Sequence, residues 1–193
     1  MLGNHHGNHH PGRIWRPNRR SLLRAGGVSV LGLLAGGVFA LARDNPVRSL
    51  AIHNIHTGEN LTTEYWAEGN YLPGALAQIS HVLRDHKTNE AVPVDPSLLD
   101  ILHSLGRAIG TRGPIHVHAG FRAPSSKDRL IALTGGVPGR SLHLQGMAVD
   151  IMLPGCAPAG LYRAARSLQS GGVGYHADKG LVHIDTGPVR HWS

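Results

Sequence analysis

Cysteine is nearly absent from this sequence, and its scarcity excludes several kinds of site. Cys156 is the only cysteine among 193 residues, so an intramolecular disulfide and a zinc site built from several thiolates are both excluded. A nucleophilic cysteine needs surroundings that lower its pKa. Cys156 stands in a Pro-Gly turn ahead of a predicted helix, so we expect it to have no chemical role.

Excess positive charge is also scarce outside the N-terminal segment, although the whole chain has a net charge of +7. Residues 1–42 contain five arginines and no acidic residue, which leaves 14 basic and 12 acidic residues and a net charge of +2 for residues 43–193. Binding to nucleic acid needs a basic stripe on the folded part of a protein. No such stripe is visible, so we expect no nucleic-acid partner.

Residues 1–42 have the pattern of an export signal. Basic residues precede an apolar run from Ala25 to Ala42, which ends in the small-x-small cleavage pattern Ala40-Leu41-Ala42. The order Asn18-Arg19-Arg20-Ser21-Leu22-Leu23-Arg24 resembles a twin-arginine signal. We therefore expect export to the periplasm, with the membrane contacted only through this segment, as an anchor if it is not cleaved.

Residues 43–49 are predicted to form a linker, and residues 50–193 one folded domain. Asp95 and Pro96 suit the N-cap and the first residue of a helix. Helices that precede and interleave with strands indicate an α+β fold, with a small antiparallel sheet and helices packed mainly on one side. Hydrophobic patterns predict strands at 50–55, 61–66, 115–119, 148–153 and 181–185, helices at 76–83, 98–109, 125–133 and 161–168, and a glycine-rich loop at 135–140.

A carboxylate inside one apolar strand is the first indication of a metal site. Asp150 interrupts the strand at 148–153, where a buried charge is costly unless it is paired or bound to a cation. His143 lies seven residues upstream, an odd spacing that would put the two on opposite faces of a regular strand. Gly146 lies between them and allows a bulge or bend that brings them together.

A second strand contributes another histidine. His183 and Asp185 share one face of the strand at 181–185. If the two strands are adjacent, His143, Asp150 and His183 surround one ion, and two histidines with one carboxylate make up a catalytic zinc site whose fourth position is left to water. A buried aspartate paired with a nearby histidine, without metal, is the alternative. His116 and His118 share a strand face, and we expect them to line a cleft or pack in the core.

Longer motifs around these residues carry a resemblance to a known family. They are Gly120-Phe121-Arg122, Ser141-x-His143-x-x-Gly146-x-Ala148-x-Asp150-Ile151, Gly171-Gly172-Val173-Gly174-Tyr175 and the segment 182–192. In these motifs the chain resembles the zinc D-alanyl-D-alanine peptidase group, most closely its murein endopeptidase K-like branch. The resemblance implies the hedgehog/D-Ala-D-Ala peptidase fold, one Zn²⁺ ion held by His143, Asp150 and His183, and hydrolysis of peptide crosslinks in peptidoglycan.

The resemblance also implies roles for residues beside the metal. Arg122 stands where the family uses an arginine for substrate binding or oxyanion stabilisation, with a structural salt bridge as the alternative. Ser141 and Tyr175 are candidate substrate-binding residues. Capping of a turn is the alternative for Ser141, and packing under a loop is the alternative for Tyr175. His191 and Trp192 are expected to close the core at the C-terminal end.

The general base is the point at which this chain departs from the family pattern. Family members often have an acidic residue three positions before the last ligand or a histidine two positions before it, where this chain has Gly180 and Leu181. Asp185 is therefore the first candidate for the catalytic base, and Asp178 and His176 in the preceding loop are weaker candidates. The alternative role of Asp185 is to orient the metal ligand His183.

Two other functions fit the same metal site. One is a D,D-carboxypeptidase or dipeptidase acting on stem peptides, which needs a closed pocket where an endopeptidase needs a cleft open at both ends. The other is a catalytically silent zinc-containing module that binds the cell wall. We expect a monomer whose partner is peptidoglycan.

Overall fold

The computed structural model describes residues 47–193, apart from residue 112 and residues 127–140. The predicted export signal, the glycine-rich loop and most of the helix predicted at 125–133 lie outside these residues. Among the residues described, no helix has both the length and the apolar character needed to cross a membrane.

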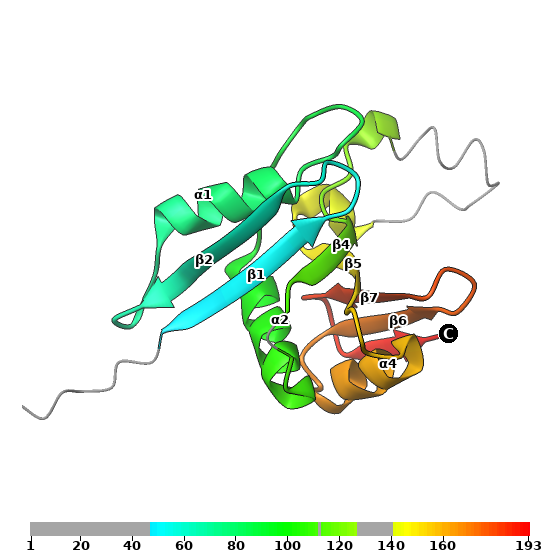
Figure 1. Cartoon of the computed structure of the whole chain (residues 1–193). Helices are drawn as coiled ribbons and strands as arrows, with labels where there is room; N and C mark the ends of the chain where they lie inside the picture. The colour runs from blue at the N-terminus through cyan, green and yellow to red at the C-terminus, as the bar shows by residue number, and fades with distance from the viewer. Residues whose placement is uncertain (1–46, 112, 127–140) are drawn as a thin grey trace, which may run out of the picture. The chain divides into compact units, whose positions relative to one another are not determined.

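One mixed sheet of eight strands organises the described residues (Figure 1), in the order β3-β2-β1-β4-β5-β7-β6-β8. β1 pairs in parallel with β4, and β6 with β8, whereas the other neighbours are antiparallel. The α+β class is confirmed, but the sheet is larger than predicted and not wholly antiparallel. The strands are β1 (Arg48–Asn54), β2 (Asn60–Ala67), β3 (Asn70–Tyr71), β4 (Ile115–Ala119), β5 (Ala148–Met152), β6 (Gly172–His176), β7 (Leu181–Asp185) and β8 (Arg190–Trp192).

Three α-helices, α1 (Pro73–Val82), α2 (Pro96–Ile109) and α4 (Pro158–Ser167), each begin with a proline, which lacks the N–H that a first turn leaves unpaired. The Asp95 side chain accepts a hydrogen bond from the Ser97 backbone N–H, so the predicted N-cap of α2 is confirmed. All three helices contribute buried side chains to one hydrophobic core with the strands, which agrees with the prediction of helices on one side of the sheet.

Alternation along the central strands separates the core from the opposite face of the sheet. Val149 and Ile151 of β5 belong to the core, as do Val182 and Ile184 of β7. Since successive side chains of a strand point to opposite faces, the polar residues between them project from the face that the helices do not cover. This arrangement gathers three polar side chains in the centre of the sheet: Asp150, His183 and Asp185.

The C-terminal part of the sheet differs most from the prediction. Residues 172–176 were not predicted to form a strand but form β6, and the helix predicted at 161–168 is α4, which begins at Pro158 and ends at Ser167. β6 is held as a strand by pairing with β7 on one side and β8 on the other. The expectation that Trp192 closes the core is wrong, because Trp192 lies on the edge strand β8 with 39% of its surface exposed.

Candidate metal centre and active site

Three buried side chains converge on the polar face of the sheet. Asp150 and His183 are direct partners across the β5–β7 ladder, and His143 comes from a short 3₁₀ helix, η1 (Leu142–Gln145). Nδ1 of His183 lies 2.9 Å from Oδ1 of Asp150 and 3.2 Å from Nε2 of His143, and these last two atoms are 3.3 Å apart. Three donor atoms from two strands and a turn thus form a compact triangle.

His143 reaches this triangle from a turn and not from a strand. η1 ends at Gly146, whose φ of 68° is left-handed and favours glycine. A Cβ at this position would also overlap the carbonyl oxygen of Pro93. The bend expected between His143 and Asp150 is therefore present, and it resolves the odd spacing by placing His143 outside the strand.

The triangle has the size and chemistry of one face of a zinc site. Zinc bonds of about 2.0–2.2 Å to nitrogen and oxygen correspond to distances of about 3.3–3.6 Å between ligand atoms in a tetrahedron. The observed edges of 2.9–3.3 Å are close to this range. Within the described ranges, these residues form the one group of three or more metal-binding side chains with ligand atoms within 4.8 Å of one another. Two imidazoles and a carboxylate fit a catalytic zinc ion.

Hydrogen bonds behind the two histidines set their tautomers. Nδ1 of His143 lies 2.7 Å from the carbonyl oxygen of Gly120, which can only accept, so Nδ1 carries the proton and Nε2 has a free lone pair. Nε2 of His183 lies 2.9 Å from Oδ2 of Asp185, which leaves the Nδ1 lone pair of His183 facing the triangle. Both rings therefore present the nitrogen that a metal needs.

Asp185 lies behind His183, wholly buried. Oδ2 accepts hydrogen bonds from His183 and from Nη2 of Arg190, while Oδ1 accepts from Nη1 of Arg190 and from the backbone N–H groups of Gly172 and Gly187. Burial alone would raise the pKa of the Asp185 carboxyl, but the bonds from His183 and Arg190 outweigh it and hold that pKa below its usual range. Both oxygens are occupied, and the carboxylate is directed at the back of the His183 ring.

Two glycines of β6 make room for this arrangement. Gly172 pairs with Asp185 and Gly174 pairs with His183 across the β6–β7 ladder. A Cβ on Gly172 would overlap the Asp185 carboxylate and the Arg190 guanidinium, and a Cβ on Gly174 would overlap the Trp192 indole. The glycine motif at 171–174 therefore provides space beside the histidine and aspartate of β7.

Trp192 forms a wall beside the donor triangle. Its ring centroid lies 5.3 Å from that of His183, and the Arg190 guanidinium lies 5.2 Å from the indole centroid. The sequence pattern did not reveal Arg190 and Trp192 as site residues. Their two-residue spacing would have placed them on one strand face, had β8 been recognised.

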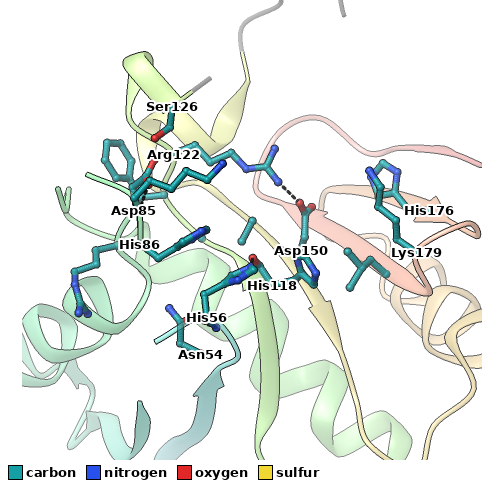
Figure 2. A pocket seen from close by; sticks show the side chains of 16 residues that line it. Asn54, His56, Asp85, His86, His118, Arg122, Ser126, Asp150, His176 and Lys179 are labelled. Atoms are coloured by element: carbon teal, nitrogen blue, oxygen red, sulfur yellow. Dashed lines mark hydrogen bonds and ion pairs between the residues drawn. The ribbon is translucent and has the colours of Figure 1, made fainter. Parts of the chain in front are cut away.

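Arg122 approaches Asp150 from the segment that follows β4 (Figure 2). Its Nη2 donates to Oδ2 of Asp150 over 2.7 Å, and its backbone N–H donates to the carbonyl of His143. Burial would raise the pKa of the Asp150 carboxyl, but the adjacent imidazoles of His143 and His183 and the charge of Arg122 keep it below its usual range. The salt bridge considered for Arg122 is present, and the guanidinium also lines a cleft.

The other two predicted site residues lie in different surroundings. Ser141 immediately precedes η1, but its side chain makes no capping hydrogen bond, so the capping alternative is not realised. Tyr175 pairs with Val182 on the core side of β6 and stacks on Tyr162 of α4 with centroids 5.4 Å apart. The structure therefore does not bring Tyr175 to the donor triangle, since it points to the opposite face of the sheet.

A cleft of about 360 Å³ borders Asp150. Its walls come from the end of β1, the loop after α1, the end of β4 and the turn between β6 and β7. In Figure 2, His86 lies on one side of Asp150, and His176 and Lys179 lie on the other. The lining residues at its two ends are exposed, among them His86, Lys87 and Lys179.

A family model and curated relatives indicate the same family for this chain. Residues 42–192 match the family model described as peptidoglycan L,D-endopeptidase MepK. The peptidoglycan L,D-endopeptidase MepK of Escherichia coli (strain K12) is 38% identical over 176 residues, which cover 91% of this chain and 97% of that protein. The probable peptidoglycan L,D-endopeptidase MepK of Haemophilus influenzae is 32% identical over 177 residues, 91% of this chain and 95% of that protein. No solved structure gives a significant match.

Proposed function

The chain belongs to the peptidoglycan L,D-endopeptidase MepK family, and from this membership we propose that it is a zinc-dependent endopeptidase that cuts peptide crosslinks in peptidoglycan. The observation that carries the proposal is the triangle of His143, Asp150 and His183, whose three ligand atoms lie 2.9–3.3 Å from one another. One zinc ion held there would polarise the scissile carbonyl and lower the pKa of a water to about 7.

The protein's own groups hold these ligands in place. We propose that Asp150 supplies one oxygen to the metal while Arg122 holds the other, so that the carboxylate is fixed and its charge is partly balanced. Asp185 and Arg190 keep the proton of His183 on Nε2 and so leave Nδ1 available. The carbonyl oxygen of Gly120 holds the proton of His143 on Nδ1 and so leaves Nε2 of His143 available.

We assign to Asp185 the orientation of His183, in place of the role of general base that was our first expectation. A base must reach the proton that it removes over about 2.6–3.2 Å. Both oxygens of Asp185 are engaged with groups behind the ligand, and its side chain is wholly buried. Arg122 and Ser141 are the candidates for contact with substrate, because Arg122 lines the cleft and Ser141 stands at the start of η1.

Two features favour an endopeptidase over the other functions. The cleft has exposed residues on both sides of Asp150, as a crosslinked substrate that continues in both directions requires. Three protein ligands leave a fourth position open, whereas structural zinc sites are closed by four. The first feature argues against a dipeptidase pocket, and the second argues against a silent wall-binding module.

We further propose that residues 1–42 export the protein to the periplasm through a twin-arginine pathway and that residues 43–49 link this segment to a domain at 50–193. Family membership supports this location, because peptidoglycan is an envelope polymer. Replacement of Arg19-Arg20 by Lys-Lys should leave the protein in the cytoplasm in a fractionation experiment. Periplasmic recovery of this variant would contradict the twin-arginine route.

The function can be tested with the full chain and purified crosslinked muropeptides. We expect the crosslinked species to fall and shorter peptides to appear, with loss of both changes on chelation and recovery on addition of zinc. His143→Ala serves as the inactive control. Release of terminal D-Ala with crosslinks intact would favour the carboxypeptidase, and bound zinc without any product would rule out both enzymes.

A further inference from the structure

Three histidines from different segments meet at one end of the cleft. His56 follows β1, His86 follows α1, and His118 belongs to β4. The rings of His56 and His86 stack with centroids 4.0 Å apart and planes 16° from parallel, and the ring of His118 meets His56 edge-on at 4.9 Å. His56 donates from Nε2 to the carbonyl oxygen of His118 over 2.9 Å, which fixes its orientation. All three line the cleft that borders Asp150 (Figure 2).

This cluster does not have the geometry of a second metal site. Among the described residues, the only set of three or more donor side chains with ligand atoms within 4.8 Å of one another is His143, Asp150 and His183. One nitrogen of His56 is already committed to a carbonyl. The cluster therefore suits a ligand that accepts hydrogen bonds from separate imidazoles.

The charges along the cleft favour an anionic ligand. Asp85 is buried, and its carboxylate accepts hydrogen bonds from the backbone N–H groups of Lys87, Thr88 and Ala123. Asp150, the other acid in the lining, is held by its histidines and by Arg122. Four permanent cations, Arg84, Lys87, Arg122 and Lys179, line the cleft with these two acids. Arg84 is paired with Glu59 and Arg122 with Asp150, and the lining still has more positive than negative charges. A cleft with this excess of positive charge attracts anions.

The protonation of the histidines adds to this preference. Burial and the neighbouring His56 lower the pKa of both His86 and His118. A bound anion opposes both effects, because it stabilises the imidazolium forms. Binding of an anion at this end of the cleft is therefore linked to proton uptake. His176 and Lys179, from the β6–β7 turn, are the charged or titratable groups on the other side of Asp150.

We propose that His56, His86 and His118, together with Lys87, form a subsite for a carboxylate of the peptide substrate. The strand order places β4 and β8 on opposite sides of β5 and β7, so this subsite and Trp192 flank the donor triangle from opposite sides. The inference rests on the proposed function, because it assigns the carboxylate to a crosslinked stem peptide. Such peptides carry free carboxylates at chain ends and side chains.

The test compares the full-length, zinc-loaded protein on crosslinked peptides that carry either the free carboxylate or the carboxamide at each such position. Charge-assisted hydrogen bonds predict that one amidation lowers kcat/KM by roughly tenfold or more in the wild-type protein. In the double variant His56→Gln with His86→Gln, the ratio of kcat/KM between the carboxylate and carboxamide peptides should fall severalfold. The change should come from a higher KM for the carboxylate peptide, while zinc content and Tm stay unchanged. His81→Gln is the matched control, since His81 is an exposed histidine of α1 outside the cleft lining.

Selectivity that survives in the double variant would overturn the subsite. If the wild-type protein cleaves no crosslinked peptide, the proposed function fails, and binding is then followed by NMR of the histidine ring protons. Addition of the carboxylate peptide should shift the signals of His56 and His86, and the carboxamide peptide should not. Equal shifts with both peptides, or none with either, would also overturn the subsite.

Discussion

Asp150 and His183 face each other as partners on adjacent antiparallel strands, with Oδ1 and Nδ1 2.9 Å apart. Their spacing is set by the backbone of the β5–β7 ladder and not by flexible loops. Sites built on strands hold their geometry more closely than sites built on loops. His143 is joined to this rigid pair by the turn at Gly146.

Removal of the carboxylate from the triangle should remove the metal. In Asp150→Asn the side chain keeps its shape but loses its charge, so we expect zinc affinity to fall by more than about 100-fold and cleavage to be lost. Titration with zinc against a competing chelator measures the affinity. Asp178→Asn, an exposed position in the β6–β7 turn, is the control. Unchanged zinc binding in Asp150→Asn would rule out Asp150 as a ligand.

Excess zinc distinguishes two roles for Asp185, orientation of His183 and general-base catalysis. If Asp185 orients His183, Asp185→Asn should weaken zinc binding by roughly 10–100-fold and recover most activity once zinc is saturating. A lost general base would instead lower kcat by about 10²–10⁴-fold with zinc fully bound. Arg190→Gln should give a smaller effect in the same direction. If zinc-saturated Asp185→Asn has low activity, Asp185 acts as the general base and not as an orienting residue.

The close packing beside β6 allows a third prediction about the site. In Gly174→Ala the new methyl group overlaps the Trp192 indole, so Trp192 must move, and we expect a loss of about 1–3 kcal/mol in the free energy of unfolding. Activity should fall as well, because Trp192 lies against His183. Gly74→Ala on α1 is the matched control, since a Cβ there meets no atom within 4 Å. Equal stability of the two variants would contradict the close packing of Trp192.

Acid should remove the stabilisation that Asp85 provides. Burial would raise the pKa of its carboxyl, but hydrogen bonds from Lys87, Ser126 and Ala123 lower it overall. A folded pKa below the unfolded value of about 3.9 means that the stabilisation is complete above that pH and is lost as the pH falls through the folded pKa. Asp85→Asn should therefore cost about 1–3 kcal/mol near pH 7.

Urea denaturation at several pH values measures this loss. The difference between wild type and Asp85→Asn should stay constant from about pH 7 to pH 5 and shrink below about pH 4. Asp178→Asn again serves as the exposed control. A difference that does not change with pH would show that the contribution of Asp85 does not depend on its charge.

Local patterns predicted the elements whose character lies in their own residues. The apolar spacing of α2 and its Asp95 cap are both present, and so are the strands that carry Asp150 and His183. β6 was not predicted, because two of its five residues, Gly172 and Gly174, have no strand preference of their own. It becomes a strand only through pairing with β7 and β8, which lie later in the chain.

The same limit applies to the surroundings of the ligands. The alternation of His183 and Asp185 predicted a shared face, and they are hydrogen-bonded. Nothing local indicated that Arg190 would engage both oxygens of Asp185, since that contact depends on the position of β8. Tyr175 illustrates the converse error, because a polar aromatic beside a glycine motif can face either side until the register of its strand is known.

β8 follows all three proposed ligands in the chain, yet Arg190 in this strand holds the carboxylate that orients one of them. A protein shortened before Arg190 would keep His143, Asp150 and His183 but lose the group that secures the His183 tautomer. The surroundings of His183 are therefore complete only when residues 190–192 pair with β6. An affinity tag attached after Trp192 would adjoin the strand that holds Asp185 behind His183. A tag for purification is therefore better placed elsewhere in the chain.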